Sequence, residues 1–328
     1  MSATVLSAVV NAAVLSFVLV AVLELVLRVL RNRLGNASTR FALWLAALCM
    51  TVTLPLVYLL VPFNTPADSI QVETLASGRP VEFDGNVTAV LPFPQGMSLP
   101  QVEQSRTLWD RFVSGIEIPP GPWAGGVLAL WAAAGGLMLL RLPVSYAWLY
   151  RRRARAEPTS VNSKVNFWMA RCGSKRRVRV AVSQEVASPV AIGPFRPVIL
   201  IPAQLVDRLD NEQLEQIGLH EAAHLARWDD VLLLIQRIVT AIFVLHPIVH
   251  WVAARLDIER ELACDDAVVA ATGQARNYAE CLTRVAEFAN GLAGSPVAAS
   301  AVENRTALER RLECCWTRVA TPAGICSR

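Results

Sequence analysis

Three long apolar stretches of the chain are each long enough to cross a membrane as a helix. They lie at residues 5–27, 41–61 and 123–146. A helix needs about 20 mostly apolar residues to span a hydrocarbon core of about 30 Å. The first stretch follows no basic segment and has no convincing small-residue cleavage site, which favours an uncleaved anchor over a signal peptide. The pattern therefore predicts three transmembrane helices.

The charged residues beside these stretches predict how the chain is oriented. Arginines gather between the first and second stretches and directly after the third, at Arg28, Arg31, Arg33, Arg40, Arg151, Arg152, Arg153 and Arg155. Such clusters favour the cytoplasmic side. Residues 63–120 hold seven acidic residues against three arginines, so we expect this loop outside the cell, as a connection or a sensor. The N-terminus is then outside, and the chain after Arg151 is cytoplasmic.

The second half of the chain has shorter patterns that predict a domain with a small sheet and several helices. Residues 178–182, 190–192 and 198–201 are apolar and β-branched, and Ser-Pro and Gly-Pro breaks separate them, as expected for short strands. Asp210 followed by Gln213 predicts the first turn of a helix. We predict a membrane α+β protein. Its parts are a two-helix segment at 1–62, an extracytoplasmic loop at 63–120, a third span at 121–150, a mostly helical cytoplasmic domain at 151–313 and a tail at 314–328.

The helix predicted after Asp210 contains His220-Glu221-Ala222-Ala223-His224. Residues four apart lie one turn above each other, so two imidazoles on one face can bind the same zinc ion. Glu221 is offset by about 100° from His220. It is therefore placed to take a proton from a water that zinc activates, and to pass it to the leaving amine. A five-residue motif arises by chance often enough that a second feature is needed.

Glu261 and Asp265 supply that second feature. They lie one turn apart on a predicted helix within E-R-E-L-A-C-D-D. Glu261 is the predicted third metal ligand, and Asp265 is predicted to orient a ligand imidazole through its free ring nitrogen. The alternative for Glu261 is a surface ion pair with a neighbouring arginine. For Asp265 the alternative is a solvated helix face shared with Asp266.

The apolar segment at residues 231–254 is not expected to cross the membrane. A single crossing would place Glu261 on the opposite side from His224, although both must reach one ion. Pro247 interrupts the segment and predicts a membrane-associated hairpin or a bent, shallow pair of helices. It also disturbs the spacing of His246 and His250, which favours a core or substrate-proximal role over a second metal site. Tyr278 is expected to pack in the core, with stabilisation of an oxyanion as the alternative.

Composition agrees with a membrane protein. The chain is 54% hydrophobic and only 18% charged. Its net charge of +4 comes with no nucleic-acid-binding motif, so direct DNA or RNA binding is not expected. The basic run at residues 175–179 is read as a solvated surface, or as a site for acidic lipids or an acidic partner. The seven cysteines form no C-x-x-C pair and are expected to be reduced thiols.

Several segments of the sequence resemble the bacterial BlaR/MecR family of integral-membrane gluzincin peptidases. They are the H-E-A-A-H motif with residues 225–230 after it, the His246-Pro247 pair, and E-R-E-L-A-C-D-D at residues 259–266. Residues 193–202 also resemble the segment that this family places before its metal helix. The resemblance is strong over residues 178–312, and the three apolar stretches fit the family's usual layout.

The resemblance implies a cytoplasm-facing zinc site in which His220, His224 and Glu261 match the ligands and Glu221 matches the catalytic acid and base. Well-known members sense β-lactams and trigger removal of a transcriptional repressor. This sequence has no S-x-x-K acylation motif and no apolar span after Leu292 to carry a penicillin-binding domain outside, so we expect no β-lactam binding. The tail at residues 314–328 resembles nothing expected there and is read as natural, truncated or frameshifted.

The sequence therefore predicts a membrane-bound zinc endopeptidase. Its expected partners are the lipid bilayer and a protein substrate, which the resemblance suggests is a transcriptional repressor cleaved during signalling. One rival is a membrane quality-control peptidase that uses the same residues on many substrates. The other is a non-catalytic sensor or scaffold with a structural zinc ion, which would not need Glu221 beside the water position.

Overall fold

The computed structural model describes residues 2–30, 36–60, 121–159, 163–291 and 305–320. Over these residues the protein is mostly helical, with three long apolar helices and one small sheet. This confirms the predicted membrane α+β class. The predicted extracytoplasmic loop at residues 63–120 and the last eight residues lie outside the described part.

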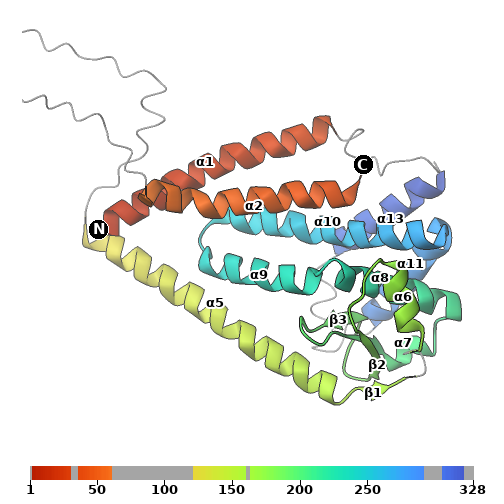
Figure 1. Ribbon diagram of the computed structural model, residues 1–328. Coiled ribbons are helices and arrows are strands. Elements are labelled where there is room, and N and C mark those ends of the chain that lie inside the picture. Colours follow the sequence, from red (N-terminus) through yellow and green to blue (C-terminus); the bar gives the residue numbers. More distant parts are fainter. Residues whose placement is uncertain (1, 31–35, 61–120, 160–162, 292–304, 321–328) are drawn as a thin grey trace, which may run out of the picture.

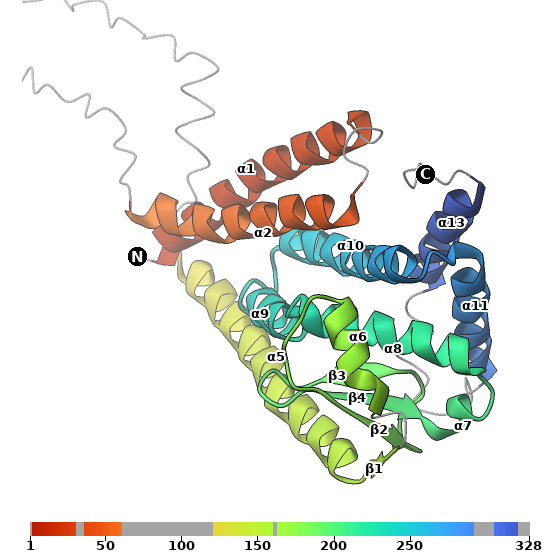
Figure 2. The ribbon, with the colours of Figure 1, turned by 45° about the vertical axis from the view of Figure 1, so that its right-hand side comes forward.

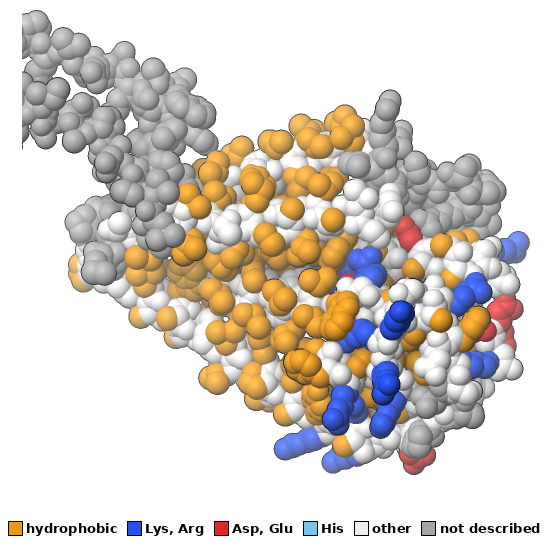
Figure 3. All heavy atoms as spheres, viewed as in Figure 1, with side chains coloured by type: hydrophobic (Ala, Val, Ile, Leu, Met, Phe, Trp, Pro, Cys, Tyr) orange, Lys and Arg blue, Asp and Glu red, His pale blue; other side chains and the backbone are white. Residues whose placement is uncertain are grey.

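The three membrane-length helices are α1 (Ser2–Val29), α2 (Ala37–Leu60) and α5 (Pro122–Ala154). Figure 1 shows that the end of α1, the start of α2 and the end of α5 all lie on the side of the molecule that carries the sheet and α8. Large apolar side chains on these helices are exposed, and Figure 3 shows them as a broad apolar surface. Such a surface is unfavourable in water, so it fits a lipid environment.

The segment after the metal motif folds as two helices, α9 (Asp229–Ile242) and α10 (Pro247–Thr272), joined by a turn at residues 243–246. α9 lies along α5, where Trp131 Nε1 donates a hydrogen bond to the Ile242 carbonyl at 2.7 Å. The first half of α10 packs against α1 and α2 in one apolar cluster that includes Trp44 and Val249. Residues 231–254 thus turn back among the apolar helices, and α10 returns to α8 (Figures 1 and 2).

The sheet has four strands in the order β1-β2-β4-β3. They are β1 (Glu157–Pro158), β2 (Arg179–Ser183), β3 (Val190–Ile192) and β4 (Val198–Pro202), with β2 and β4 parallel and the other pairs antiparallel. Three of these strands match the predicted ones, and the two-residue β1 was not predicted. The remaining helices of this part of the chain are α6 (Val165–Arg171), α7 (Ala203–Val206), α8 (Asn211–Ala226), α11 (Ala275–Gly291) and α13 (Arg305–Ala320).

Helix α8 is fixed at its start by local chemistry and along its length by packing. The Asp210 side chain accepts a hydrogen bond from the Gln213 backbone at 2.8 Å, and the Gln213 side chain accepts one from the Asp210 backbone. This capping box confirms the predicted helix start. Alternate residues of β4, Ile199 and Ile201, share a buried core with the inward face of α8. The helix that carries the two histidines is therefore held against the sheet.

Helix α13 differs from the sequence-based division of the chain. It runs across the predicted boundary at residue 314, so residues 314–320 continue a helix rather than begin a separate tail. Cys314 and Cys315 are buried against the domain, which explains why the helix continues. Cys314 is disulfide-bonded, so the prediction of a reduced thiol is wrong at this position. The free cysteines of the described part are Cys49, Cys172, Cys264, Cys281 and Cys315.

Gly218 allows α6 to pack closely on α8. A Cβ atom at this position would lie 2.4–2.6 Å from ring atoms of Trp168, which is fully buried. We predict that Gly218→Ala lowers the free energy of unfolding by about 1–3 kcal/mol, because the ring has no room to move. Thermal unfolding in detergent measures this. Gly136→Ala is the control, since nothing lies within 4 Å of a Cβ there; equal effects of the two substitutions would contradict the prediction.

Candidate metal centre

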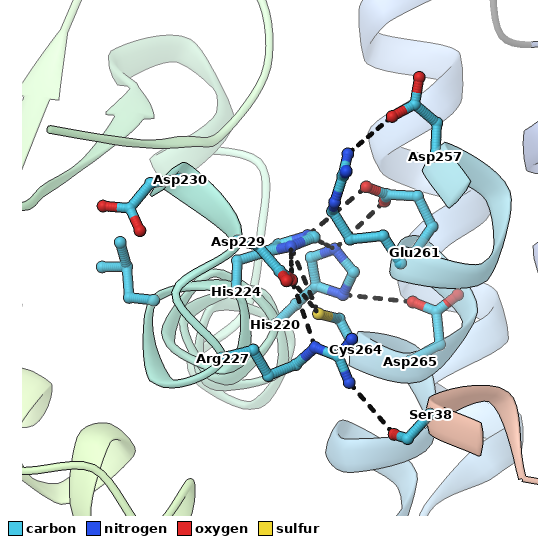
Figure 4. Close-up of polar contacts among 12 residues, drawn as sticks. Ser38, His220, His224, Arg227, Asp229, Asp230, Asp257, Glu261, Cys264 and Asp265 are labelled. Carbon is cyan, nitrogen blue, oxygen red and sulfur yellow. Dashed lines mark hydrogen bonds and ion pairs between the residues drawn. The ribbon is translucent and has the colours of Figure 1, made fainter. Parts of the chain in front are cut away.

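The structure brings the three predicted ligand side chains together. His220 and His224 point from α8 toward Glu261 on α10 (Figure 4). The two Nε2 atoms are 3.2 Å apart, and each lies 3.5 Å from a different carboxylate oxygen of Glu261. These three residues form one group whose ligand atoms all lie within 4.8 Å of one another.

The spacing of these atoms fits a tetrahedral metal. Zinc binds imidazole nitrogen and carboxylate oxygen at about 2.0–2.1 Å, which in a tetrahedron separates neighbouring ligand atoms by roughly 3.3 Å. The observed separations are 3.2, 3.5 and 3.5 Å. Two imidazoles and one carboxylate also leave a fourth position open, as catalytic zinc sites do. The residues present therefore fit a zinc ion.

A carboxylate stands behind each imidazole. Asp265 Oδ1 lies 3.2 Å from Nδ1 of His220, and Asp229 Oδ2 lies 3.0 Å from Nδ1 of His224. Such contacts fix the ring orientation and leave Nε2 free to bind a metal. Sequence reasoning proposed this role for Asp265 but missed Asp229. A signal for Asp229 was present, because it lies five residues after His224 at the start of the next helix.

Tyr278 and Arg311 extend this network from two further helices. The fully buried Tyr278 hydroxyl donates to Asp265 Oδ1 at 2.6 Å and lies 3.0 Å from His220 Nδ1. Arg311 of α13 contacts both Asp265 and Glu261. Tyr278 thus packs in the core, as expected, but its hydrogen bonds to the carboxylate and imidazole were not predicted. Arg311 was missed entirely.

The link between α8 and α9 is a strained turn that places Asp229. Trp228 has φ 61° and ψ 30°, a left-handed conformation that is unfavourable by about 1–2 kcal/mol for a residue with a side chain. The Arg176 guanidinium stacks on the Trp228 ring at 4.0 Å and donates to the Leu225 carbonyl and to Asp230. Arg176 is thus a partly buried structural residue rather than part of the solvated or lipid-binding run expected from the sequence.

Asp229 has two further neighbours, and one of them reaches α2. Arg227 Nε donates to Asp229 Oδ2 at 3.3 Å, while its Nη1 donates to Ser38 Oγ at 3.1 Å (Figure 4). The Cys264 thiol lies 3.6 Å from the same carboxylate. Burial, followed by the Asp229 charge, raises the pKa of this thiol well above its usual value. Without a bound metal, this shift favours the protonated thiol, which is a weak donor to the carboxylate.

Glu221 lines a cavity that opens beside the two imidazoles. The cavity measures about 370 Å³. Its walls come from α8, α9, α10 and α11, from Arg311, and from residues at and before β3: Ser188, Pro189, Val190 and Ala191. The Glu221 side chain is at this surface and has no ion-pair partner among the described residues. Glu221 therefore borders the space next to the two imidazoles.

The electrostatics of the site favour ionised carboxylates. Burial would raise the pKa of Glu261, but the Arg311 guanidinium and the two imidazoles hold it well below its usual value. Burial and Arg311 both lower the pKa of His220. Hydrogen bonds to two carboxylates outweigh them and raise this pKa to about 9. Because metal ligation needs a neutral imidazole, metal binding and protonation of His220 compete.

Comparison with known protein families agrees with this geometry. The profile of the BlaR1 peptidase M56 family matches residues 7–315, which includes the three apolar helices and the site. The chain belongs to this family. It is therefore a membrane metallopeptidase by family, and a metal is implied. A search among curated proteins found no match.

Two other histidines of this M56 family member lie away from the metal centre. His246 sits in the turn before α10, is buried, and has no hydrogen-bond partner for either ring nitrogen within the described part of the chain. His250 lies 2.9 Å from the Val244 carbonyl through its Nε2 atom. The His250 contact thus links the first turn of α10 to the turn between α9 and α10.

The contact between Asp265 and His220 can be tested by metal binding. We predict that Asp265→Asn weakens zinc binding about 10–100-fold, because the amide no longer fixes the His220 ring as the carboxylate does. Competition with a chromogenic chelator measures the dissociation constant. Asp266→Asn is the matched control on the next residue of α10. Equal weakening in both variants would show that only local negative charge matters.

Proposed function

We propose that the protein is a membrane zinc endopeptidase that acts in regulated proteolysis. His220, His224 and Glu261 hold the metal, and Glu221 is the general base. The observation that carries this proposal is the convergence of two α8 imidazoles and one α10 carboxylate at 3.2–3.5 Å beside an open cavity. Inactivation of a transcriptional repressor is the proposed role, and it rests on the family resemblance.

The proposed mechanism assigns one task to each group. When bound, zinc would supply Lewis acidity, which lowers the pKa of water so that it can lose a proton near neutral pH and become a nucleophile. Glu221 takes a proton from the attacking water and gives it to the leaving amine. Asp265 and Asp229 keep the two imidazoles oriented. A site that only stabilised the fold would not need the unpaired carboxylate of Glu221 on the cavity wall.

An extended peptide is the substrate that this cavity accommodates. β3 pairs with β4 through one edge, and its other edge pairs with no strand of the described residues. Val190 and Ala191 of β3 line the cavity beside α8. An unpaired strand edge offers backbone donors and acceptors to a segment added in extended conformation. This arrangement supports cleavage within a chain, where the substrate passes across the site.

We propose that the metal centre faces the cytoplasm. The ends of α1 and α5 that are rich in arginine lie on the same side of the molecule as the sheet and α8. Arginines at such positions favour the cytoplasmic side. The hairpin of α9 and α10 begins and ends on that side, so the metal motif and Glu261 need no further crossing to meet.

Two substitutions separate metal binding from catalysis. We predict that Glu221→Gln keeps zinc but loses proteolysis by about 10²–10⁴-fold, because the amide cannot accept the proton. His224→Ala is predicted to lose both. Zinc content is measured by elemental analysis of purified protein, and proteolysis by mass spectrometry of new protein N-termini in cells expressing each variant.

Glu215→Gln, on the same helix, is the control and should behave like the wild type. New N-termini that persist in Glu221→Gln would remove Glu221 as the base. The number of N-termini that depend on Glu221 also separates the two enzymatic roles. A few defined sites agree with regulated proteolysis, whereas many sites in unrelated membrane proteins agree with quality control.

The orientation of the chain is tested with reporter fusions. We predict that alkaline phosphatase, which is active only outside the cytoplasm, is active when fused within residues 63–120 and inactive when fused after Arg155. A fluorescent protein that folds only in the cytoplasm should give the reverse pattern. The opposite result in both reporters would place the metal centre outside the cell.

A further inference from the structure

Arg311 is partly buried at the proposed metal centre although it lies outside both sequence motifs. Its side chain is only 16% exposed. Nε and Nη2 donate to Oδ2 and Oδ1 of Asp265 at 2.9 and 2.8 Å, and Nη1 lies 3.0 Å from Oε2 of Glu261. One guanidinium therefore contacts two carboxylates of α10 at once.

These two carboxylates need a shared cation. Glu261 and Asp265 lie four residues apart on α10 and so occupy the same face of the helix. Two like charges at this spacing repel each other, and the repulsion grows with burial. The planar guanidinium offers parallel donors that match a carboxylate, which a lysine ammonium cannot do. Arg311 lets both groups stay ionised and close together.

The same contacts determine how the proposed ligands are oriented. Oε2 of Glu261 is held by Arg311, while Oε1 lies 3.5 Å from Nε2 of His224. Asp265, held by Arg311 in two places, in turn contacts Nδ1 of His220. Arg311 thus acts on one proposed ligand directly and on another through Asp265.

We propose that Arg311 is a positioning residue of the metal centre, and that α13 thereby supports a site whose proposed ligands come from α8 and α10. The proposal rests on the ligand set proposed above. It assigns no contact with substrate to Arg311. Its effect is to fix the orientation of Glu261 and Asp265 before a metal binds.

The test is zinc affinity of the full-length protein in detergent, measured by chelator competition. Arg311→Gln is expected to bind zinc about 10–100-fold more weakly than the wild type, as when other groups that orient ligands are lost. Arg311→Lys is expected to be intermediate, because it keeps the charge but loses the parallel donors. Arg310→Gln is the matched control, since Arg310 is exposed on the same helix, and it should bind like the wild type.

A second measurement distinguishes positioning from loss of folding. With Co²⁺ in place of zinc, the visible absorption spectrum reports ligand geometry, and we expect Arg311→Gln to alter it while Arg310→Gln does not. Thermal unfolding without metal checks that each variant folds. If Arg311→Gln does not fold, Arg311→Lys decides by the same two measurements. Combining Arg311→Gln with Asp265→Asn should weaken binding by less than the product of the single effects, because both act through one contact.

Wild-type affinity and spectrum in a folded Arg311→Gln, or in Arg311→Lys if it alone folds, would overturn the proposal. Tighter zinc binding in either variant would overturn it too. Nη2 of Arg311 lies 3.4 Å from Nε2 of His220, so tighter binding would mean that the guanidinium competes with the metal. Failure of the proposed function has a different signature. It would appear as no zinc binding by the wild type, or as unchanged zinc binding in His224→Ala.

Discussion

The architecture depends on one constraint, that side chains from α8 and α10 meet at the proposed metal site. The histidines lie on α8 and the carboxylate on α10, and the chain between them is apolar. A straight passage through the membrane would separate them, so the chain must turn back. The turn at residues 243–246 does this, and α10 then runs as one helix of 26 residues, about 39 Å long. Its first half lies among α1 and α2, and its second half carries Glu261.

The metal centre and the membrane helices consequently form one packed unit. Ser38, at the start of α2, accepts a hydrogen bond from Arg227, which also donates to the carboxylate behind His224. A second contact joins α2 to α10. Arg40 of α2 pairs with Glu259 at 2.9 Å, and Glu259 lies two residues before the proposed ligand Glu261. Polar contacts therefore run from the end of a membrane helix to groups that orient the ligands. These contacts of Ser38 and Arg40 give a structural basis for coupling the apolar helices to the site.

The predictable parts of this structure are those set by local periodicity. The three membrane-length helices follow from apolar length, and the start of α8 follows from Asp210 and Gln213. The helical period also places His220 and His224 on one face of α8. It places Glu261 and Asp265 on one face of α10, before any tertiary structure is considered. These features depend only on residues within a few turns of each other, so the sequence displays them directly.

The remaining parts of the site depend on tertiary packing. Tyr278 and Arg311 reach the centre because α11 and α13 fold back against α8 and α10, and neither residue has a spacing that signals this. Arg311 resembles a surface residue in sequence, since it follows Arg310 and precedes Glu313 by two positions. The two-residue strand β1 is likewise defined only by its pairing with β2. Long-range contacts of this kind leave no local pattern.

Three acidic side chains around the site are paired with an arginine, and a fourth is not. Buried carboxylates need a paired cation or a metal. Glu261 and Asp265 share Arg311, and Asp229 is paired with Arg227. Glu221 alone of these four acidic residues has no ion pair among the described residues, and it lies on the cavity wall. A carboxylate fixed by a guanidinium is a poor proton acceptor, because the cation stabilises its ionised form. This difference between Glu221 and the three paired carboxylates is what supports the proposal that Glu221 is the general base.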